Sequence, residues 1–379
     1  MRYLWRDHRL QLKGASGTAK KAGGGRGPKH SFYGACAPGL EGCIAEFLAE
    51  RFPDLSIPRA LSGALVFETS CPYDQLNLFC FNNIFRVLGS APIQGGGREA
   101  LERFVLDTLR RRAGEELFTA FPAGSRERDF RVIFSLENTP AAVGGELRAR
   151  AEAYIASRSG LRVNRGGSGA EFWFLLRREG AFFMRRLTRH RPWDKLLHPG
   201  ELPPPLAWVL CRLSAPRPGE RIADPFCGYG AIPLARLRHF PPAEFFASDI
   251  DGRALAAARA KFGGAPQHCC HFNRLDAAEL PRLIPPASLD SVITDPPWGC
   301  YRAARDRPER PAEERAAPAG ERYDQILRVF AGLLKPGGRV VMLCGRGGEP
   351  DAERNGFTPI RQIPILLSGK KATICVLHT

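Results

Sequence analysis

The chain has 379 residues, and because ordinary domains contain roughly 100 to 200 residues, two or three domains are predicted. No apolar run approaches the roughly 20 residues that cross a bilayer and no signal-peptide core follows Met1, so we expect a cytoplasmic protein that does not span membranes. The net charge of +16 favours a polyanionic partner, with RNA or DNA ahead of a membrane surface.

The position of the positive charge and the spacing of the cysteines support three further predictions. By direct count about +11 of the net charge lies before His198 and about +5 after it, so the first half is the expected nucleic-acid platform. The eleven cysteines form no CxxC pair and are expected to be reduced. His268-Cys269-Cys270-His271 lies where a strand is expected, whose alternation sends neighbours to opposite faces, so no metal site is predicted.

The first half begins with a basic arm and a small α/β unit. Residues 1–30 are rich in Arg, Lys and Gly and are predicted to be disordered. The run Cys36 to Gly42 opens a predicted helix that continues through Ile44 and Leu48, and Ala64 to Phe67 reads as a strand.

The next segment has an α+β pattern. Helices are predicted over Arg98 to Arg112 and Gly145 to Ser157. Strands are predicted over Phe130 to Leu136, Glu171 to Leu176 and Ala181 to Leu187. This segment ends in a basic cluster that is consistent with phosphate contacts. The alternative is a solvated charged face. The predicted RNA-binding residues are Arg185, Arg186, Arg189 and Arg191.

From His198 onward strands alternate with helices, which predicts a doubly wound parallel sheet of the Rossmann-like α/β class. Pro364 to Leu377 reads as two strands around Ser368-Gly369, a hairpin at the sheet edge.

A glycine-rich turn follows the first strand of this half. Asp224-Pro225-Phe226-Cys227-Gly228-Tyr229-Gly230 connects a strand to a helix, and its glycines let the backbone approach a nucleoside closely. The next strand ends at Asp249-Ile250-Asp251, where Asp249 is preferred over Asp251 as the acceptor for ribose hydroxyls. Asp276, after a third strand, is the candidate for an adenine amino group. Without a full GxGxxG, this series favours S-adenosylmethionine over a dinucleotide; its predicted contacts are Asp224, Phe226, Cys227, Gly228, Gly230, Asp249, Ile250 and Asp276.

Asp295-Pro296-Pro297-Trp298 follows the apolar run Leu289 to Thr294, which reads as a buried strand. Open α/β sheets bind ligands at the carboxyl ends of their strands. A carboxylate, two prolines without N–H donors and an aromatic ring suit a planar base that carries an exocyclic amine. For this tetrad alone, a helix cap at Asp295 and a core role for Trp298 are the competing interpretation.

In this order, the runs around His198, Asp224, Asp249 and Asp295 resemble the class I S-adenosylmethionine-dependent guanosine-N2 methyltransferases that carry an N-terminal THUMP domain. Ala37-Pro38-Gly39-Leu40-Glu41 resembles the opening of the ferredoxin-like domain before THUMP. The chain departs from the usual form at Tyr229 and Ala231, where small hydroxyl residues are commoner, and in the 301–320 segment.

The resemblance implies four parts. Residues 1–30 are the disordered arm, 31–95 a ferredoxin-like domain, 96–190 a THUMP RNA-binding domain and 191–379 the methyltransferase domain. The implied fold is a doubly wound class I methyltransferase domain with an α+β ferredoxin-like and THUMP half before it.

The implied reaction transfers a methyl group to N2 of a guanosine, with a tRNA acceptor stem as the first substrate. We expect Asp295 and the Pro296 carbonyl to accept the amino hydrogens, Pro297 to help fix the backbone, and Trp298 to stack on the base. The alternatives are ribosomal or small nuclear RNA, a DNA amino-methyltransferase, and an inactive RNA-binding protein. A small activating protein partner is a further open alternative.

Overall fold

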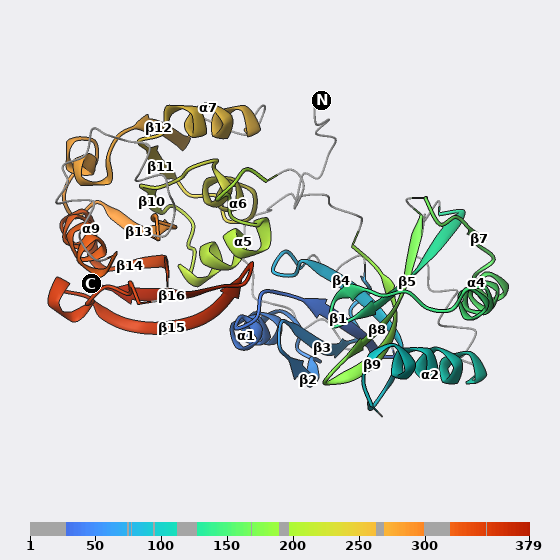
Figure 1. Cartoon of the computed structure of the whole chain (residues 1–379). Coiled ribbons are helices and arrows are strands. Elements are labelled where there is room, and N and C mark those ends of the chain that lie inside the picture. The colour runs from blue at the N-terminus through green and yellow to red at the C-terminus, as the bar shows by residue number, and fades with distance from the viewer. Residues whose placement is uncertain are drawn as a thin grey trace.

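The structure is a computed structural model that describes residues 28–73, 76, 78–93, 95–111, 127–167, 169–188, 197–262, 269–298, 319–345 and 347–379. Residues 1–27 of the predicted arm lie outside the described residues, as does most of the 301–320 segment. Two sheets organise the described chain, one in each half (Figure 1).

The N-terminal half is built on a nine-stranded sheet in the order β2-β3-β1-β4-β9-β8-β5-β6, with β7 paired to β5. The antiparallel pairing of β4 with β9 joins the 31–95 and 96–190 segments into one continuous sheet. The strands are β1 (His30–Ala35), β2 (Ser56–Leu61), β3 (Ala64–Thr69), β4 (Asn83–Ala91), β5 (Asp129–Leu136), β6 (Thr139–Pro140), β7 (Arg162–Val163), β8 (Ala170–Arg177) and β9 (Gly180–Arg186).

The described helices that accompany this sheet are α1 (Glu41–Arg51), α2 (Gly97–Arg110) and α4 (Gly145–Ser159). The other helices and the strands predicted for this half are confirmed to within two residues at each end, but the first helix begins at Glu41 and not at Cys36. The run from Cys36 to Leu40 forms a turn before α1, in which Gly39 has a φ of +98°. In α2, Leu101, Phe104, Val105 and Thr108 recur at helical spacing and are buried, which is why this face packs on the sheet.

The C-terminal half holds a seven-stranded sheet in the order β12-β11-β10-β13-β14-β16-β15. The first five strands are parallel, and β16 and β15 are antiparallel, so the predicted doubly wound sheet and edge hairpin are confirmed. The strands are β10 (Arg221–Asp224), β11 (Glu244–Asp249), β12 (Cys270–Arg274), β13 (Leu289–Thr294), β14 (Leu334–Gly345), β15 (Thr358–Leu367) and β16 (Lys370–His378).

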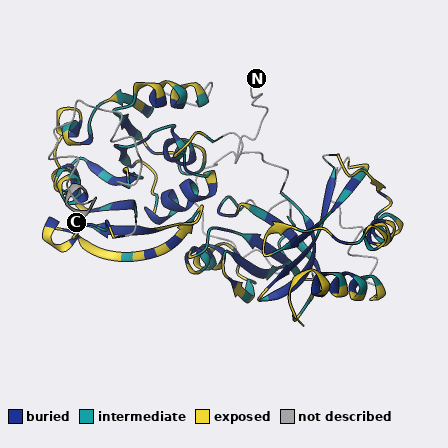
Figure 2. Ribbon diagram, in the orientation of Figure 1, coloured by how far each residue is buried: buried dark blue, intermediate teal, exposed yellow. Residues whose placement is uncertain are grey.

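Both faces of this sheet are covered. One core contains α5 (Pro204–Leu213), α6 (Ala231–His239) and α7 (Gly252–Lys261), and the other contains α9 (Ala319–Leu333) and the short helix η4 (Ala277–Arg282). A second short helix, η6 (Glu353–Asn355), precedes β15. Along β10, Ile222 faces the first core and Ala223 the second, so this central strand is buried on both faces of the sheet (Figure 2).

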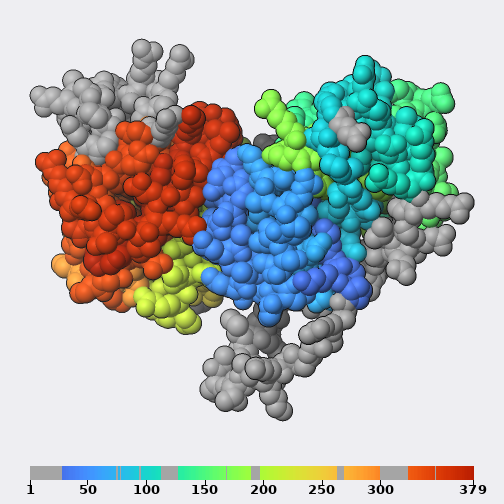
Figure 3. Space-filling view, turned by 90° about the horizontal axis from the view of Figure 1, so that it is seen from below, coloured from blue at the N-terminus to red at the C-terminus, as the bar shows by residue number. Residues whose placement is uncertain are grey.

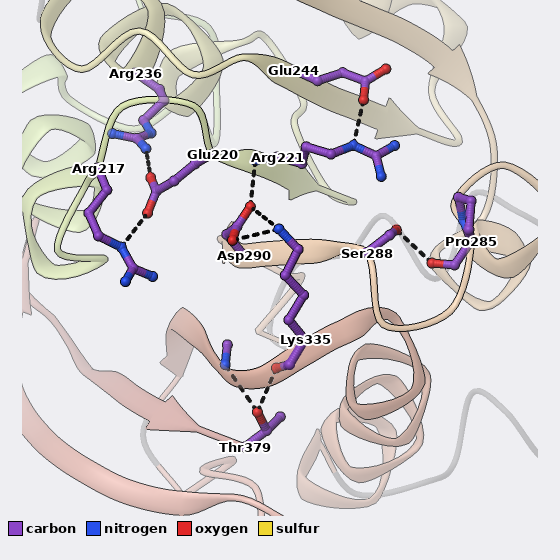
Figure 4. Close-up of polar contacts among 11 residues, drawn as sticks. Arg217, Glu220, Arg221, Arg236, Glu244, Pro285, Ser288, Asp290, Lys335 and Thr379 are labelled. Carbon is purple, nitrogen blue, oxygen red and sulfur yellow. Dashed lines mark hydrogen bonds and ion pairs between the residues drawn. The ribbon is translucent and has the colours of Figure 1, made fainter.

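The amino ends of the central strands are tied by polar contacts (Figure 4). The Asp290 carboxylate accepts hydrogen bonds from the backbone N–H of Arg221 at 2.8 Å and from Lys335 Nζ at 2.8 and 2.9 Å. Arg236 of α6 forms a buried ion pair with Glu220. These contacts fix the strand register at one edge of the sheet and leave the opposite edge for ligands.

The two halves touch through α1, α5 and β15, and their surfaces are continuous in the space-filling view (Figure 3). Pro38 accepts a hydrogen bond on its carbonyl oxygen from the N–H of Leu366 at 2.9 Å. Arg361 of β15 pairs with both oxygens of Glu46, at 2.6 and 2.9 Å. The apolar core of α1 therefore continues into that of the second half.

Among the described helices, none is long and apolar enough to cross a bilayer. Cys270 and His271 lie on β12, as expected from the sequence, while His268 is outside the described residues. Within the part of the chain that the structure describes, no group of three or more His, Cys, Asp or Glu side chains is arranged to hold a metal ion.

Candidate active site

Three acids meet at the carboxyl edge of the parallel sheet. Asp224 ends β10, Asp249 ends β11, and Asp295 directly follows β13. Because β11, β10 and β13 are adjacent and parallel, their last residues lie side by side. These three positions therefore share the carboxyl edge of the sheet.

The glycine-rich turn is tied to the end of β11. The N–H of Cys227 donates to the Ser248 carbonyl oxygen at 3.0 Å, and the N–H of Gly228 donates to Oδ2 of Asp249 at 2.9 Å. Gly228 and Gly230 have φ angles of +49° and +82°, which favour glycine. A Cβ on Gly228 would meet nothing within 4 Å, so open space lies beside the backbone there. The turn therefore leaves room beside its backbone for a ligand.

A Cβ on Gly230 would instead lie 3.0 Å from the Cβ of Ala258 in α7. Gly230 thus allows close packing between the turn and α7, and α6 begins at the next residue.

Asp249 and Asp251 have different surroundings. Asp249 contacts the glycine-rich turn through Oδ2, which accepts the Gly228 N–H, while its Oδ1 accepts the N–H of Asp251 at 2.8 Å. The Asp251 side chain caps α7 by accepting the N–H groups of Arg253 at 2.9 Å and Ala254 at 3.3 Å. Asp251 is occupied as a helix cap, which supports the preference for Asp249.

The remaining predicted cofactor residues lie around this edge. Ile250 is half-buried after β11, and Phe226 is half-buried in the turn. The Asp276 side chain caps η4, accepting the N–H of Ala278 at 3.0 Å, so the structure gives it an ordinary helix-cap contact. Asp276 follows β12, the strand next to β11, and therefore lies on the same edge of the sheet.

Asp224 is an internal residue. It is 1% exposed, and its Oδ1 accepts hydrogen bonds from Thr294 Oγ1 at 2.8 Å and the N–H of Phe226 at 3.2 Å. Its Oδ2 is buried with no hydrogen-bond partner among the described residues. Burial raises the pKa of Asp224 well above its usual range. The cofactor contact expected of Asp224 stays a prediction, and in the structure its Oδ1 joins β10 to β13 through Thr294.

In the Asp-Pro-Pro-Trp tetrad, the indole Nε1 of Trp298 donates to Oδ1 of Asp295 at 2.9 Å. Burial raises the pKa of Asp295 to about 7, and the Trp298 hydrogen bond opposes part of that effect. The hydroxyl of Tyr323, from α9, donates to the carbonyl oxygen of Pro297 at 3.1 Å. The tetrad is therefore held from a neighbouring helix as well as by its own strand.

Trp298 packs beside Gly345, at the end of β14, where a Cβ would lie 2.8 Å from the Cβ of Trp298. Sequence analysis missed Thr294, Tyr323 and Gly345 as parts of this site. Thr294 was a detectable polar residue in an apolar strand directly before the tetrad. Tyr323 and Gly345 carry no local signal, because only the packing of α9 and β14 brings them to the site.

Tyr229, an atypical residue for the turn, stacks on His198 with ring centroids 4.0 Å apart and an interplanar angle of 7°. Lys261 of α7 lies 5.7 Å from the Tyr229 ring centroid and forms an ion pair with Glu201. The stacking of Tyr229 on His198 holds the His198 segment against the glycine-rich turn. This packing explains the large residue at position 229.

Two of the predicted RNA-binding arginines point inward. Arg185 is 5% exposed and pairs with Glu127 at 2.6 Å, and Arg186 pairs with Glu171 at 3.0 Å. The prediction of phosphate contacts is corrected for these two, since their guanidinium groups are engaged in internal ion pairs. Arg189 and Arg191 lie outside the described residues.

Comparison with known proteins agrees with this geometry. Residues 191–347 match the family model described as an RMKL-like methyltransferase domain. The tRNA (guanine(6)-N2)-methyltransferase of Thermus thermophilus is 33% identical over 175 residues, 45% of this chain and 48% of that protein. The tRNA (guanine(10)-N2)-dimethyltransferase of Methanothermobacter thermautotrophicus is 28% identical over 159 residues, 42% of each chain. The chain thus matches about half the length of these curated relatives or less.

The solved structure of TrmN from Thermus thermophilus resembles nearly the whole chain. The two share a TM-score of 0.65 at 24% identity, over 92% of this chain and 99% of TrmN. The fold is therefore a class I methyltransferase domain preceded by an α+β half, as the sequence predicted.

Proposed function

Residues 191–347 match the model of the RMKL-like methyltransferase domains, and on this premise we propose that the protein transfers a methyl group from S-adenosylmethionine to the exocyclic N2 of a guanosine in RNA. The proposed substrate is tRNA, with the acceptor stem as the first candidate. The names of the two curated relatives, which give guanines 6 and 10 of tRNA, support this choice.

One observation carries the proposal. The hydrogen bond of 2.8 Å from Thr294 to Asp224 joins the residue before the tetrad to the first residue of the glycine-rich turn. A base held at Asp295 to Trp298 and a cofactor held at Gly228 would therefore be neighbours. The opposite arrangement, with the two places facing apart, would have excluded a direct methyl transfer between them.

The residues present fit S-adenosylmethionine. The open space beside Gly228 admits the close approach of a ligand to the backbone, and the adjacent Asp249 carboxylate suits ribose hydroxyls. When bound, S-adenosylmethionine supplies an electrophilic methyl group on a sulfonium sulfur.

The tetrad supports the acceptor side of the reaction. The lone pair of a guanine amino group is delocalised into the ring, so positioning is the main catalytic requirement. Asp295 and the Pro296 carbonyl accept the amino hydrogens, and Trp298 supports the plane of the base. As the new C–N2 bond forms and the carbon–sulfur bond breaks, N2 loses a proton to Asp295. A carboxyl group with a pKa of about 7 suits that proton transfer near neutral pH.

The test uses purified protein with methyl-labelled S-adenosylmethionine and four unmodified substrates: tRNA, ribosomal RNA, small nuclear RNA and duplex DNA. We expect label in tRNA, recovered as N2-methylguanosine by nucleoside mass spectrometry. Label confined to another RNA would change the substrate, and label only in DNA adenine or cytosine would overturn the proposal. Comparing tRNA from cells with and without the gene then maps the nucleotide.

A protein that binds RNA without catalysis is the remaining alternative. Calorimetry with S-adenosylmethionine decides it, because a micromolar or tighter complex requires an intact turn, whereas a decayed cofactor site binds none.

A further inference from the structure

The indole N–H of Trp298 is not directed at solvent or at an approaching base. It reaches back three residues and donates to Oδ1 of Asp295 at 2.9 Å. The ring is half-buried and packs on the apolar core beside Gly345, so its direction is fixed by its surroundings. A stacking role alone would need the ring and not this hydrogen bond.

The hydrogen bond engages one of the two Asp295 oxygens, because Oδ1 accepts the Trp298 N–H. Asp295 itself is half-buried, so an acceptor oxygen remains within reach of a ligand.

Among the described residues, no positively charged side chain contributes to the pKa of Asp295. Asp224 faces it from β10 and Cys344 from β14, and Asp295 raises the pKa of both. Glu349 acts in the same direction on Cys344, and Tyr323 of α9 contacts the tetrad through the Pro297 carbonyl. Burial raises the pKa of Asp295, and the Trp298 hydrogen bond is the cause that opposes it.

We propose that the indole N–H of Trp298 is a positioning group that holds Oδ1 of Asp295, keeps the carboxylate ionised and leaves Oδ2 to accept the proton of the guanine amino group. This role is separate from base stacking and rests on the proposed function. In the balanced step, the methyl carbon leaves sulfur and bonds to N2, the N2 proton passes to Oδ2, and Asp295 later releases it to water.

The decisive variant is Trp298→Phe, which keeps an aromatic ring and removes the N–H. With an unmodified tRNA transcript and methyl-labelled S-adenosylmethionine, kcat/KM is measured from pH 5.5 to 9. We expect the acidic limb to move upward by about half a pH unit to one unit, the worth of one hydrogen bond to a carboxylate. The pH of the limb, and not the rate at the plateau, is the readout, because the ring of residue 298 also belongs to the proposed base site.

Trp173→Phe is the matched control. Its Nε1 also donates to a carboxylate, Glu171 Oε2 at 3.1 Å, but in the N-terminal sheet. Its acidic limb should coincide with that of wild type. A Trp298→Phe enzyme whose acidic limb is unmoved, whether its activity is high or uniformly low, overturns the proposal.

A direct titration separates this proposal from the proposed function. In protein labelled with ¹³C at aspartate carboxyls, the Asp295 signal is assigned by its loss in Asp295→Asn and followed with pH, without RNA. The pKa should rise in Trp298→Phe, and an unchanged value overturns the N–H role. If wild type methylates no guanosine, the proposed function fails while this titration still reports on the hydrogen bond.

Discussion

The Thr294 hydroxyl and the Asp224 carboxyl group are joined by a buried hydrogen bond of 2.8 Å that links the last residue of β13 to the last residue of β10. The same Asp224 oxygen accepts the N–H of Phe226 in the glycine-rich turn. One carboxyl group thereby connects the start of the cofactor turn to the strand that carries the tetrad.

Replacing Thr294 tests this connection. Thr294→Val removes the donor with little change of shape and should lower the free energy of unfolding by about 1 to 2 kcal/mol. It should also weaken S-adenosylmethionine binding several-fold, because the turn loses its attachment. Thr294→Ser keeps the hydroxyl and should retain the affinity. Calorimetry and urea unfolding check both, and equal behaviour of the two variants would contradict the role of the hydrogen bond.

Asp249 and Asp251 should respond differently to the same change. Asp249→Ala removes the acceptor of the Gly228 N–H and the expected ribose contact, so S-adenosylmethionine affinity should fall by about tenfold or more. Asp251→Ala removes the cap of α7 and should cost about 1 kcal/mol of stability with little change in affinity. If calorimetry found the larger loss for Asp251→Ala, the assignment of the ribose acid would be reversed.

The methylation rate should depend on pH through Asp295. Its pKa is raised to about 7 by burial, and only the ionised form accepts a proton. The single-turnover rate should therefore rise with pH, reach half its maximum near pH 7 and level off above pH 8. Asp295→Asn should be slower by about 100-fold or more and lose this limb. A profile that is flat from pH 5.5 to 8 would rule out Asp295 as the proton acceptor.

The raised pKa of Asp295 should also lower the free energy of unfolding as the pH rises from about 4 through 7. Because the folded pKa of about 7 exceeds the usual value of 3.8, folding favours the protonated form. The stabilisation is complete below about pH 4 and is lost as pH rises through 7. Asp295→Asn removes this dependence and keeps an oxygen that accepts the Trp298 N–H. Relative to wild type, it should gain about 2 kcal/mol between pH 5 and pH 8.

Urea unfolding at the two pH values measures that difference. Tyr323→Phe, which alters the tetrad without removing a carboxyl group, is the control and should show no such pH-dependent gain. A stability difference for Asp295→Asn that is equal at pH 5 and pH 8 would contradict the raised pKa.

Gly39 lies where the two halves pack closely together, and we call this contact between Gly39 and β15 the joint. Its φ is +98°, and an added Cβ would overlap the carbonyl oxygen of Pro364 on β15. Gly39→Ala should therefore destabilise the joint by about 2 kcal/mol or more, beyond the cost of the backbone angle alone. We expect S-adenosylmethionine binding to persist while methylation of full-length tRNA falls, since the RNA platform and the site lose their fixed relation.

Gly97→Ala provides the matched comparison, because Gly97 has a φ of +73° and open space around its Cβ position. Thermal unfolding and tRNA methylation should be affected much less in this variant. Similar losses in both would show that backbone strain, and not the joint, is responsible.

The sequence predicted the elements whose signals are local. The β-branched run before Asp295 and the glycines after Asp224 predicted strand ends, and parallel topology then required those ends to share one edge. The hairpin around Ser368-Gly369 followed from turn chemistry, and both residues do adopt positive φ.

The basic cluster was interpreted less accurately. Arg185 and Arg186 read as surface charge because composition cannot tell whether a strand residue faces solvent or a partner carboxylate. Strand pairing turned both inward toward Glu127 and Glu171. Net charge indicates the class of partner and not which side chains meet it.

The sequence by itself determined the fold class, the order of the motifs and the residue types at the site, because periodicity and turn chemistry act over a few neighbouring residues. Tertiary structure alone decided which carboxyl groups are free to act. Asp224 became an internal link, Asp251 and Asp276 became helix caps, and Asp295 acquired its raised pKa and its contact with Trp298. These properties depend on desolvation and hydrogen bonds that form only when separate strands and helices pack together.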